Sequence, residues 1–590
     1  MRQFFKYVFA TVVGILISTV LIAILFIAII SAAVSSMDSN KSTDIADNSV
    51  LYLNLDQNIQ ERTPAKGFDD LPVIGSASGS KSIGFYDFIL ALKRAKTDDR
   101  IKGIYLTVSS PSAGKATLKE IRDALIDFKK SHKQIIAYSE IYTQDAYYLA
   151  SVADKVYLNP QGSLEFKGFS SQLTFFKGAM EKLGIEAQIV RVGNYKSAVE
   201  PFTTDKMSEY NRAQVTAYLG GIYETFLSGI SASRDIPADT LAVMANTYRI
   251  QQPADAVSAK LVDALQYKDE VIDQLRRLTG KEQQENLSTV SINDYAANQK
   301  PENSDSKNKI AVIYANGDIT GGEGSDASIG SERISRAIRK ARLDDKISAI
   351  VLRVNSGGGS ALASDVIWRE VLLSKKVKPV IASFGDVAAS GGYYIGCAAD
   401  SIFVQPNTIT GSIGVFGIIP NFQNLLTGKL GLTFDGVKTA QYADIMSTNR
   451  PMTPGERMII QQGVNQVYDT FITRVADGRK RPKSYIDSIA GGHVWIGTDA
   501  VRIGLADRIG NFRDALNAAA KKAKLSEYRI VEYPQKTDAL KSLLSDAGDN
   551  VRTYYAKREF GENYMLYEQM KKAMLQSGIQ TRLPFSISVQ

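Results

Sequence analysis

Residues 381–417 read IASFGDVAASGGYYIGCAADSIFVQPNTITGSIGVFG, and they place a small polar residue at the end of a buried strand. The apolar run 380–384 is followed by AASGG at 388–392. Small residues and glycines at the exit of a strand let the backbone turn sharply into a helix. Ser390 would then lie beside the free N–H groups that open the helix, where negative charge is stabilised. The pattern predicts a nucleophilic serine, and the alternative is a tight packing joint without chemistry.

A second glycine-rich turn lies upstream of this stretch. Residues 350–360 read IVLRVNSGGGS, a buried-type strand that runs into three glycines. A glycine loop after a strand can present bare amides to an oxyanion, as an acyl-transfer site requires beside its nucleophile. By itself the loop could equally hold a phosphate or be only a turn.

The chain contains two copies of one pattern. An offset of 246 residues superimposes 82–160 on 328–406 without gaps, so that Tyr147 falls on Tyr393. Strand-like and helix-like segments alternate in both copies, which predicts two tandem α/β repeats with mostly parallel, buried sheets. The first copy has Gln144 at the position of Ser390, and Pro111-Ser112-Ala113 replaces the three glycines. The first copy therefore lacks both the nucleophile and the glycine loop.

Composition limits the classes of function. A chain of 590 residues is too long for one hydrophobic core, and 44% apolar with 22% charged residues is typical of globular proteins. The net charge of +8 comes without a dense basic run, so nucleic acid is not an expected partner. The single cysteine, Cys397, excludes an intrachain disulfide and is interpreted as a core residue.

The N-terminus predicts a membrane anchor. Residues 7–34 carry no charge and are much longer than the apolar region of a cleavable signal. Arg2 and Lys6 precede this run, so the N-terminus is expected in the cytoplasm and the rest of the chain on the other side. A cleaved signal is the alternative, because small residues cluster at 31–36.

The expected domain organisation follows from these features. It comprises a cytoplasmic N-terminus (1–6), a transmembrane anchor (7–34), a tether (35–48), an N-terminal α/β repeat (49–295), a polar linker (296–308), a C-terminal α/β repeat (309–528) and a C-terminal helical extension (529–590).

In combination, NSGGGS, GDVAASGGYY and TGSIGVFG resemble the protease IV family of signal peptide peptidases, serine proteases related in fold to the Clp peptidase and the crotonases. The resemblance runs from the anchor to about residue 520. It implies two crotonase/Clp-peptidase-like repeats behind one transmembrane helix. One departure is Gly357, where the family usually has proline.

A serine hydroxyl needs a base that takes its proton, and the usual base is histidine. The chain has only two histidines, His132 and His493, and neither lies beside a carboxylate arranged like a triad. The family's base is a lysine in the motif YKSAVEPF, which residues 195–202 match in full, so the resemblance implies Lys196 as general base. Burial would have to lower its pKa from about 10.4 toward neutrality. With one residue of slippage Lys196 falls on Ala443 of the second copy, so the second copy lacks the lysine as the first lacks the serine. These complementary losses agree with a site whose Lys196 and Ser390 come from different repeats.

The resemblance also implies the remaining site residues and the partners. Ser412 matches the family's serine that hydrogen-bonds the lysine, and Gly358 and Gly391 are the candidate oxyanion donors, with Gly359 as alternate. No metal or other cofactor is expected. Family members degrade remnant signal peptides in the bacterial inner membrane, with a periplasmic body, and assemble as homotetramers. A crotonase-like acyl-CoA enzyme and a catalytically silent membrane scaffold are the competing hypotheses.

Overall fold

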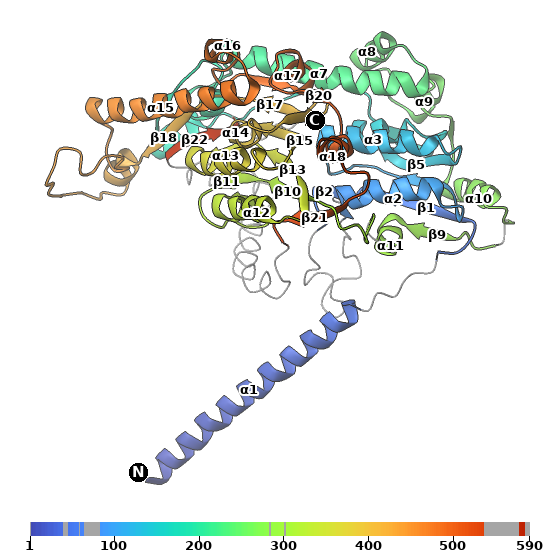
Figure 1. Ribbon diagram of the computed structural model, residues 1–590, viewed down its shortest axis with the longest axis horizontal. Coiled ribbons are helices and arrows are strands. Elements are labelled where there is room, and N and C mark those ends of the chain that lie inside the picture. The colour runs from blue at the N-terminus through green and yellow to red at the C-terminus, as the bar shows by residue number, and fades with distance from the viewer. Residues whose placement is uncertain are drawn as a thin grey trace.

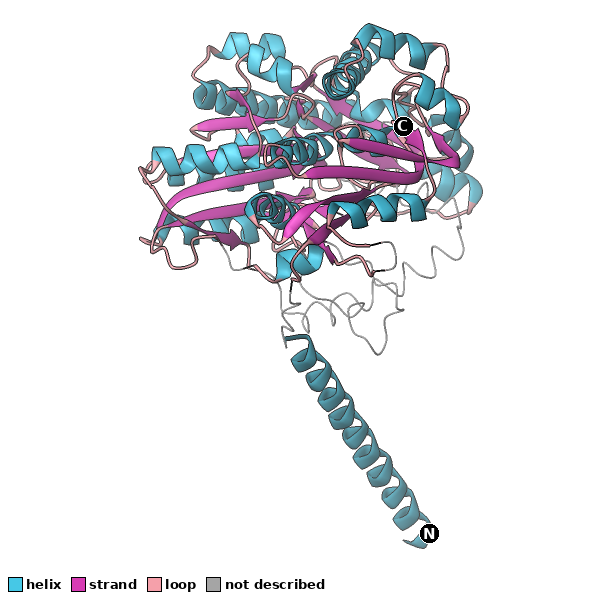
Figure 2. Cartoon of the chain, turned by 90° about the vertical axis from the view of Figure 1, so that its right-hand side faces the viewer, coloured by secondary structure: helices cyan, strands magenta, loops and turns pink. Residues whose placement is uncertain are grey.

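The computed structural model describes residues 2–38, 45–57, 59–63, 83–282, 285–299, 302–535 and 578–583. Helix α1 (Arg2–Asp38) projects away from a body in which helices lie on both sides of strands (Figures 1 and 2). The body contains the two α/β repeats, and its buried apolar side chains form two large clusters, one centred on each repeat.

Helix α1 includes the predicted anchor, residues 7–34. Its described apolar side chains, among them Phe9, Leu16 and Leu25, are exposed. The side chains of residues 26–38 lie outside the described set. Within the part of the chain that is described, no helix is both long enough and apolar enough to cross a membrane.

The first repeat contains a parallel sheet with the strand order β8-β6-β5-β4-β1-β9. Its strands are β1 (Ser49–Asn54), β4 (Ile101–Thr107), β5 (Gln134–Tyr142), β6 (Lys155–Leu164), β8 (Ala264–Leu265) and β9 (Thr289–Ser291). Helices α2 (Phe85–Thr97), α3 (Lys115–Lys129) and α4 (Gln144–Ala150) connect consecutive strands. A parallel sheet needs such crossover helices, whose apolar faces cover it.

The second repeat has a similar sheet, in the order β19-β17-β15-β13-β10-β21, with β16 beside β15 and β20 beside β16; its pairings are parallel except that of β19 with β17, which is antiparallel. Its strands are β10 (Lys309–Asn316), β13 (Ile347–Ser356), β15 (Val380–Ala389), β16 (Ser401–Val404), β17 (Ile409–Gly411), β19 (Val494–Ile496), β20 (Arg508–Ile509) and β21 (Arg529–Tyr533). Its main helices are α12 (Ser331–Leu343), α13 (Ala361–Lys375), α14 (Gly391–Gly396), α15 (Pro454–Arg479) and α18 (Phe512–Lys522). The chain is therefore a tandem repeat of one parallel α/β unit.

One detail of the repeat differs from the gapless superposition. Lys133 donates to the carbonyl of Asp98 at 2.7 Å, and Lys378 makes the same contact with Asp344 at 2.5 Å. The two aspartates are 246 residues apart, but the two lysines are only 245 apart, because the second repeat has one residue fewer in the turn before its strand. The register is restored before the helix that begins at Gln144 in the first repeat and after Ser390 in the second.

A third sheet joins the two repeats, with the order β12-β11-β14-β22-β18-β7. Its strands are β7 (Glu186–Arg191), β11 (Asp318–Thr320), β12 (Ser328–Gly330), β14 (Gly358–Ser360), β18 (Phe416–Asn421) and β22 (Gly578–Arg582). Strand β7 of the first repeat pairs antiparallel with β18 of the second, with Arg191 opposite Phe416. The segment after β7 is thereby carried into the second repeat.

Part of the predicted C-terminal helical extension, 529–590, is strand. Residues 529–533 form β21, which pairs parallel with β10, and 578–582 form β22. The segments for which the sequence pattern predicts helices, 537–545 and 550–575, lie outside the described residues.

Candidate active site

Ser390 lies at the junction of β15 and α14, where the backbone turns sharply. Its φ of 54° and ψ of −117° are unusual for a residue with a side chain. Two residues later, position 392 requires glycine, because a Cβ there would lie 2.3 Å from the carbonyl oxygen of Ser356. Ser390 is 0% exposed. Strain of this kind persists only where the surrounding structure enforces it, and it is common at functional sites.

Lys196 reaches the same place from the first repeat. After β7 the chain passes against the loop at Gly491 and Gly492, and the Tyr195 N–H donates to the Gly491 carbonyl at 3.1 Å. A Cβ on Gly492 would lie 2.5 Å from the backbone nitrogen of Lys196, and a Cβ on Gly193 would lie 2.3 Å from the carbonyl oxygen of Gly491. Glycine at both positions lets the two backbones approach closely.

The Lys196 amine contacts both candidate serines. Nζ lies 2.8 Å from Ser390 Oγ, 3.0 Å from Ser412 Oγ and 3.2 Å from the Ser412 carbonyl oxygen. All three residues are 0% exposed. Burial lowers the pKa of Lys196 well below its ordinary value, because desolvation disfavours the ammonium form. The three residues expected from the sequence therefore lie together, around an amine that loses its proton easily.

The candidate oxyanion glycines lie beside the serine, but their amides are not equally free. The Gly358 N–H donates to Ser356 Oγ at 3.1 Å. Gly359 lies in strand β14, with Thr581 of β22 opposite it. Among the described residues, the Gly391 N–H donates to no acceptor. Gly391 thus presents the available amide, and Gly358 could add a second one only after releasing Ser356.

Gln214 is a site residue that the sequence analysis missed. It lies on α7 (Glu209–Arg234) and is 1% exposed. Its Nε2 donates to Ser197 Oγ at 2.8 Å and to the Tyr195 carbonyl at 3.2 Å, and its Oε1 accepts from the Val494 N–H at 3.2 Å. The residues on both sides of Lys196 are thus tied to the loop that contacts them. No local pattern around this glutamine indicates the role.

Both histidines have other surroundings. His493 stacks on Trp495, with ring centroids 3.9 Å apart, and lies against Tyr195. Its Nδ1 lies 2.9 Å from the Val494 carbonyl oxygen, and burial lowers its pKa. His132 is exposed in a turn of the first repeat. Among the described residues, neither histidine is hydrogen-bonded to Ser390.

In the first repeat Gln144 occupies the position that corresponds to Ser390. Its Nε2 donates to the Gly168 carbonyl at 2.9 Å, and its Oε1 accepts from the N–H groups of Gly168 and Lys167 at 2.9 and 3.1 Å. The side chain is 5% exposed. It ties two backbone segments together, so this copy has a structural crosslink where the other has a hydroxyl.

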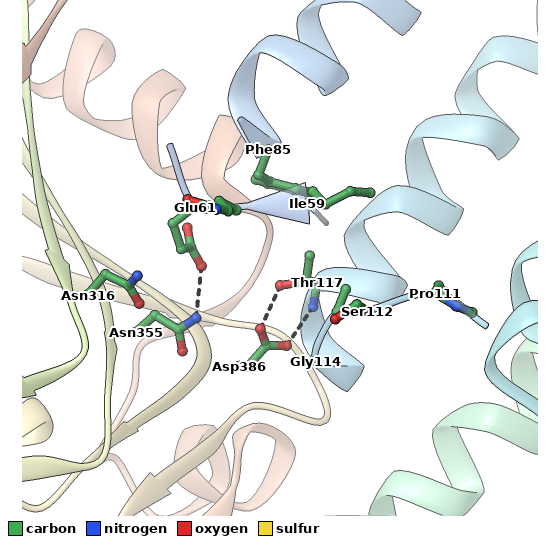
Figure 3. A pocket seen from close by; sticks show the side chains of 12 residues that line it. Ile59, Glu61, Phe85, Pro111, Ser112, Gly114, Thr117, Asn316, Asn355 and Asp386 are labelled. Carbon is green, nitrogen blue, oxygen red and sulfur yellow. Dashed lines mark hydrogen bonds between the residues drawn. The ribbon is translucent and has the colours of Figure 1, made fainter. Parts of the chain in front are cut away.

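A separate polar pocket lies between the repeats, next to the first repeat's Pro111–Gly114 loop (Figure 3). Asp386 accepts from the Thr117 N–H at 2.8 Å and from its hydroxyl at 2.7 Å, and Glu61 accepts from Asn355 at 3.2 Å. These carboxylates are thus already paired with protein donors. Within the described residues, no group of three or more His, Cys, Asp or Glu side chains could hold a metal ion.

Comparison with known proteins identifies relatives over most of the chain. The sequence profile of peptidase family S49 matches residues 127–282 and 373–526. Protease 4 of Salmonella typhi is 38% identical over 477 residues, which cover 79% of this chain and 76% of that protein. Protease 4 of Haemophilus influenzae is 36% identical over 509 residues, covering 84% and 82%. Among solved structures, a ClpP1 variant from Listeria monocytogenes is 16% identical and covers 35% of this chain and 94% of its own, with a TM-score of 0.24.

Proposed function

The chain belongs to peptidase family S49, whose members are serine proteases, and we propose that Ser390 is its nucleophile and Lys196 its general base. The observation that carries the proposal is the 2.8 Å contact between Ser390 Oγ and the Nζ of a fully buried lysine. Family membership also favours a protease over an acyl-CoA enzyme of related fold.

In the proposed mechanism, neutral Lys196 accepts the proton of Ser390 as its Oγ attacks the carbonyl carbon of a peptide bond. The negative charge that develops on the carbonyl oxygen is stabilised by the Gly391 amide, and by Gly358 once Ser356 is released. Protonated Lys196 then gives its proton to the leaving amine. A water molecule, deprotonated by the same lysine, hydrolyses the acyl-enzyme and restores the Ser390 hydroxyl.

Ser412 fits a positioning role. Its N–H donates to the His493 carbonyl at 2.7 Å, so the residue is fixed to the loop that also holds the Lys196 segment. Its Oγ and carbonyl oxygen accept two of the three N–H bonds that a protonated Lys196 could donate. The remaining direction points to Ser390, which suits proton exchange with that hydroxyl.

The proposed substrates are hydrophobic peptides at a membrane, including signal peptides that have been cleaved from exported proteins. The uncharged run at 7–34 supports a single-pass anchor in the bacterial inner membrane, and the positive charges of Arg2 and Lys6 support a cytoplasmic N-terminus and a periplasmic body. Fractionation of the full chain and of a chain that starts at residue 47 tests the anchor. The shorter chain is expected in the soluble fraction. The homotetramer stays a prediction, which light scattering tests.

The test of the catalytic proposal uses the full chain in detergent and a leucine-rich reporter peptide. Ser390→Ala and Lys196→Met are each expected to lower kcat/KM by about a thousandfold or more. Ser374→Ala is the matched control, because this serine is also 0% exposed and its Oγ has no partner among the described residues. Substantial hydrolysis by Ser390→Ala would refute the nucleophile, and substantial hydrolysis by Lys196→Met would refute the base.

A further inference from the structure

Asp386 lies in the strand that leads to the candidate nucleophile, four residues before Ser390 on β15. The regular pairing of β15 with β13 is interrupted here. Residues 385–387 form a bulge, in which three residues of β15 lie opposite one residue of β13, Asn355. Bulges redirect the strand beyond them, and they are frequent next to active sites. The direction in which β15 reaches Ser390 therefore depends on how this bulge is held.

Side chains hold the bulge in place of the regular ladder. The Val387 N–H donates to the side-chain oxygen Oδ1 of Asn355 at 3.1 Å, a contact within the second repeat. Asp386 reaches the first repeat instead, where its carboxylate accepts from the Thr117 N–H at 2.8 Å and from the Thr117 hydroxyl at 2.7 Å (Figure 3). The bulge before Ser390 is thus fixed to both repeats.

In its contact with Thr117, Asp386 also caps helix α3. The residue before this helix is Gly114, which has no side chain to accept from the free N–H groups of the first turn. In the second repeat the corresponding helix α13 follows Ser360, whose Oγ accepts from the Ala363 N–H at 3.3 Å. Thr117 and Ala363 are equivalent under the offset of 246 residues. The same N–H is therefore capped from within its own repeat in the second copy and from the other repeat in the first.

The glycine at position 114 makes room for Asp386. A Cβ on Gly114 would lie 2.1 Å from Cγ of Asp386. The backbone itself does not require glycine, because its φ of −74° and ψ of 165° are close to the −64° and 164° of Ser208, which caps helix α7 with its side chain. The three atoms nearest to the added Cβ all belong to the Asp386 carboxyl group, so removal of this group frees the space for a serine.

We propose that Asp386 is a positioning residue for Ser390. Its contact with Thr117 fixes the end of β15 against the repeat that supplies Lys196. The 2.8 Å contact between Lys196 Nζ and Ser390 Oγ joins the two repeats, so it depends on how the strand of one repeat is held against the other. Without the Asp386 carboxylate the bulge loses this anchor on the first repeat, and a small displacement of a nucleophile lowers the rate steeply. The inference rests on the proposed roles of Ser390 and Lys196.

The experiment measures hydrolysis of the leucine-rich reporter peptide by the full chain in detergent. Asp386→Ala is expected to lower kcat about ten- to a hundredfold and to change KM by less than about twofold, because the change displaces the nucleophile rather than the peptide. Asp386→Asn keeps an oxygen that accepts from the Thr117 N–H, so its kcat should stay within about threefold of the wild type. Thr117→Val removes the hydroxyl donor but keeps the shape of the side chain, and it should lower kcat about three- to tenfold.

A double variant separates positioning from helix capping. Asp386→Ala with Gly114→Ser gives α3 a serine cap like the one that Ser360 gives α13, but it leaves the contact between the repeats broken. We expect this variant to recover most of the Tm that Asp386→Ala loses, while its kcat stays as low as that of Asp386→Ala. Recovery of kcat together with Tm would show that Asp386 is only a helix cap and would overturn the inference. An unchanged kcat in Asp386→Ala would overturn it as well.

Amide hydrogen exchange gives a readout that does not need catalysis. Exchange of residues 385–391 should be about tenfold faster in Asp386→Ala and in the double variant than in the wild type, whereas the first turn of α3 should regain its protection in the double variant. Faster exchange confined to α3 would refute a positioning role. A wild-type chain that does not cleave peptides would contradict the catalytic proposal, while hydrogen exchange would still decide whether Asp386 holds the end of β15.

Discussion

Lys196 Nζ lies 2.8 Å from Ser390 Oγ, although 194 residues separate them in the sequence. The lysine follows a strand of the first repeat, β7, which pairs with β18 of the second. This pairing carries the amine to a serine that its own repeat lacks. Neither repeat holds both groups, so the site exists only where the two copies are packed together.

The first prediction is the pH dependence of activity. Burial lowers the pKa of Lys196 well below its ordinary value of 10.5. If the neutral amine is the base, kcat/KM rises with pH through one ionisation clearly below 10.5 and then reaches a plateau. Hydrolysis of the reporter peptide between about pH 6 and pH 11 measures this ionisation. An ionisation at the ordinary lysine value, or a flat profile, would contradict Lys196 as the base.

The second prediction concerns stability. Because the folded-state pKa of Lys196 is lowered, the unfolded chain binds more protons between that pKa and 10.5. The free energy of unfolding of the wild type therefore rises with pH across this window. Lys196→Met lacks this dependence and should be more stable by roughly 1–2 kcal/mol at neutral pH, with the difference shrinking toward pH 10.5. Thermal unfolding at several pH values measures it, and a variant less stable than the wild type at neutral pH would refute the prediction.

The third prediction concerns Ser412. Ser412→Ala removes the 3.0 Å hydrogen bond to Lys196 but leaves the 3.2 Å contact with the Ser412 carbonyl. We expect kcat to fall about ten- to a hundredfold with little change in KM, because a hydrogen bond to a charged group contributes about 1.5–3 kcal/mol. Ser412→Thr keeps the hydroxyl and should recover part of the activity. An effect mainly on KM would instead assign Ser412 to peptide binding.

The fourth prediction tests the close backbone approach that positions Lys196. Gly492 has a φ of 87°, and a Cβ there would lie 2.5 Å from the backbone nitrogen of Lys196. Gly492→Ala should therefore displace Lys196 and lower kcat more than a hundredfold, since small misplacements of a catalytic group are costly. Gly436→Ala is the matched control, because nothing lies within 4 Å of a Cβ at that position. Equal activity of the two variants would show that the approach is not needed.

Much of the fold follows from local sequence. Alternating apolar segments predicted the parallel sheets, and the offset of 246 residues revealed the tandem repeat, since both signals are preserved along the chain. The superposition of the two copies did not reveal the one-residue difference at Lys133 and Lys378, because a missing turn residue leaves the patterns on both sides of it intact. The sequence predicts Ser390, Lys196 and Ser412 as site residues because each lies in a distinctive motif, and in the structure their side chains lie together.

The rest of the site depends on contacts between distant segments. The pairing of β22 with β14 joins residues more than two hundred positions apart. The sequence of β22, Gly578–Arg582, has no feature that predicts which strand it pairs with. Gln214 acts through hydrogen bonds across a helix and two loops, which no spacing rule describes. The hydrogen bond from the Gly358 N–H to Ser356 Oγ likewise depends on where the serine side chain points. Such features become visible only in three dimensions.

The last prediction concerns the contact between the repeats. Arg353 of the second repeat is 1% exposed and pairs with Glu61 at 2.8 Å and Glu120 at 3.2 Å, both from the first repeat. Arg353→Met leaves two buried carboxylates without their cation, so we expect the free energy of unfolding to fall by about 3–5 kcal/mol. Arg339→Met is the control. The Arg339 side chain pairs with Glu370 but is 54% exposed, so its loss should lower the free energy of unfolding by less than about 1 kcal/mol. Thermal unfolding compares the two. Similar losses in both would mean that this cluster does not hold the repeats together, and the cross-repeat site would then depend on the other contacts between them, among them the pairing of β7 with β18.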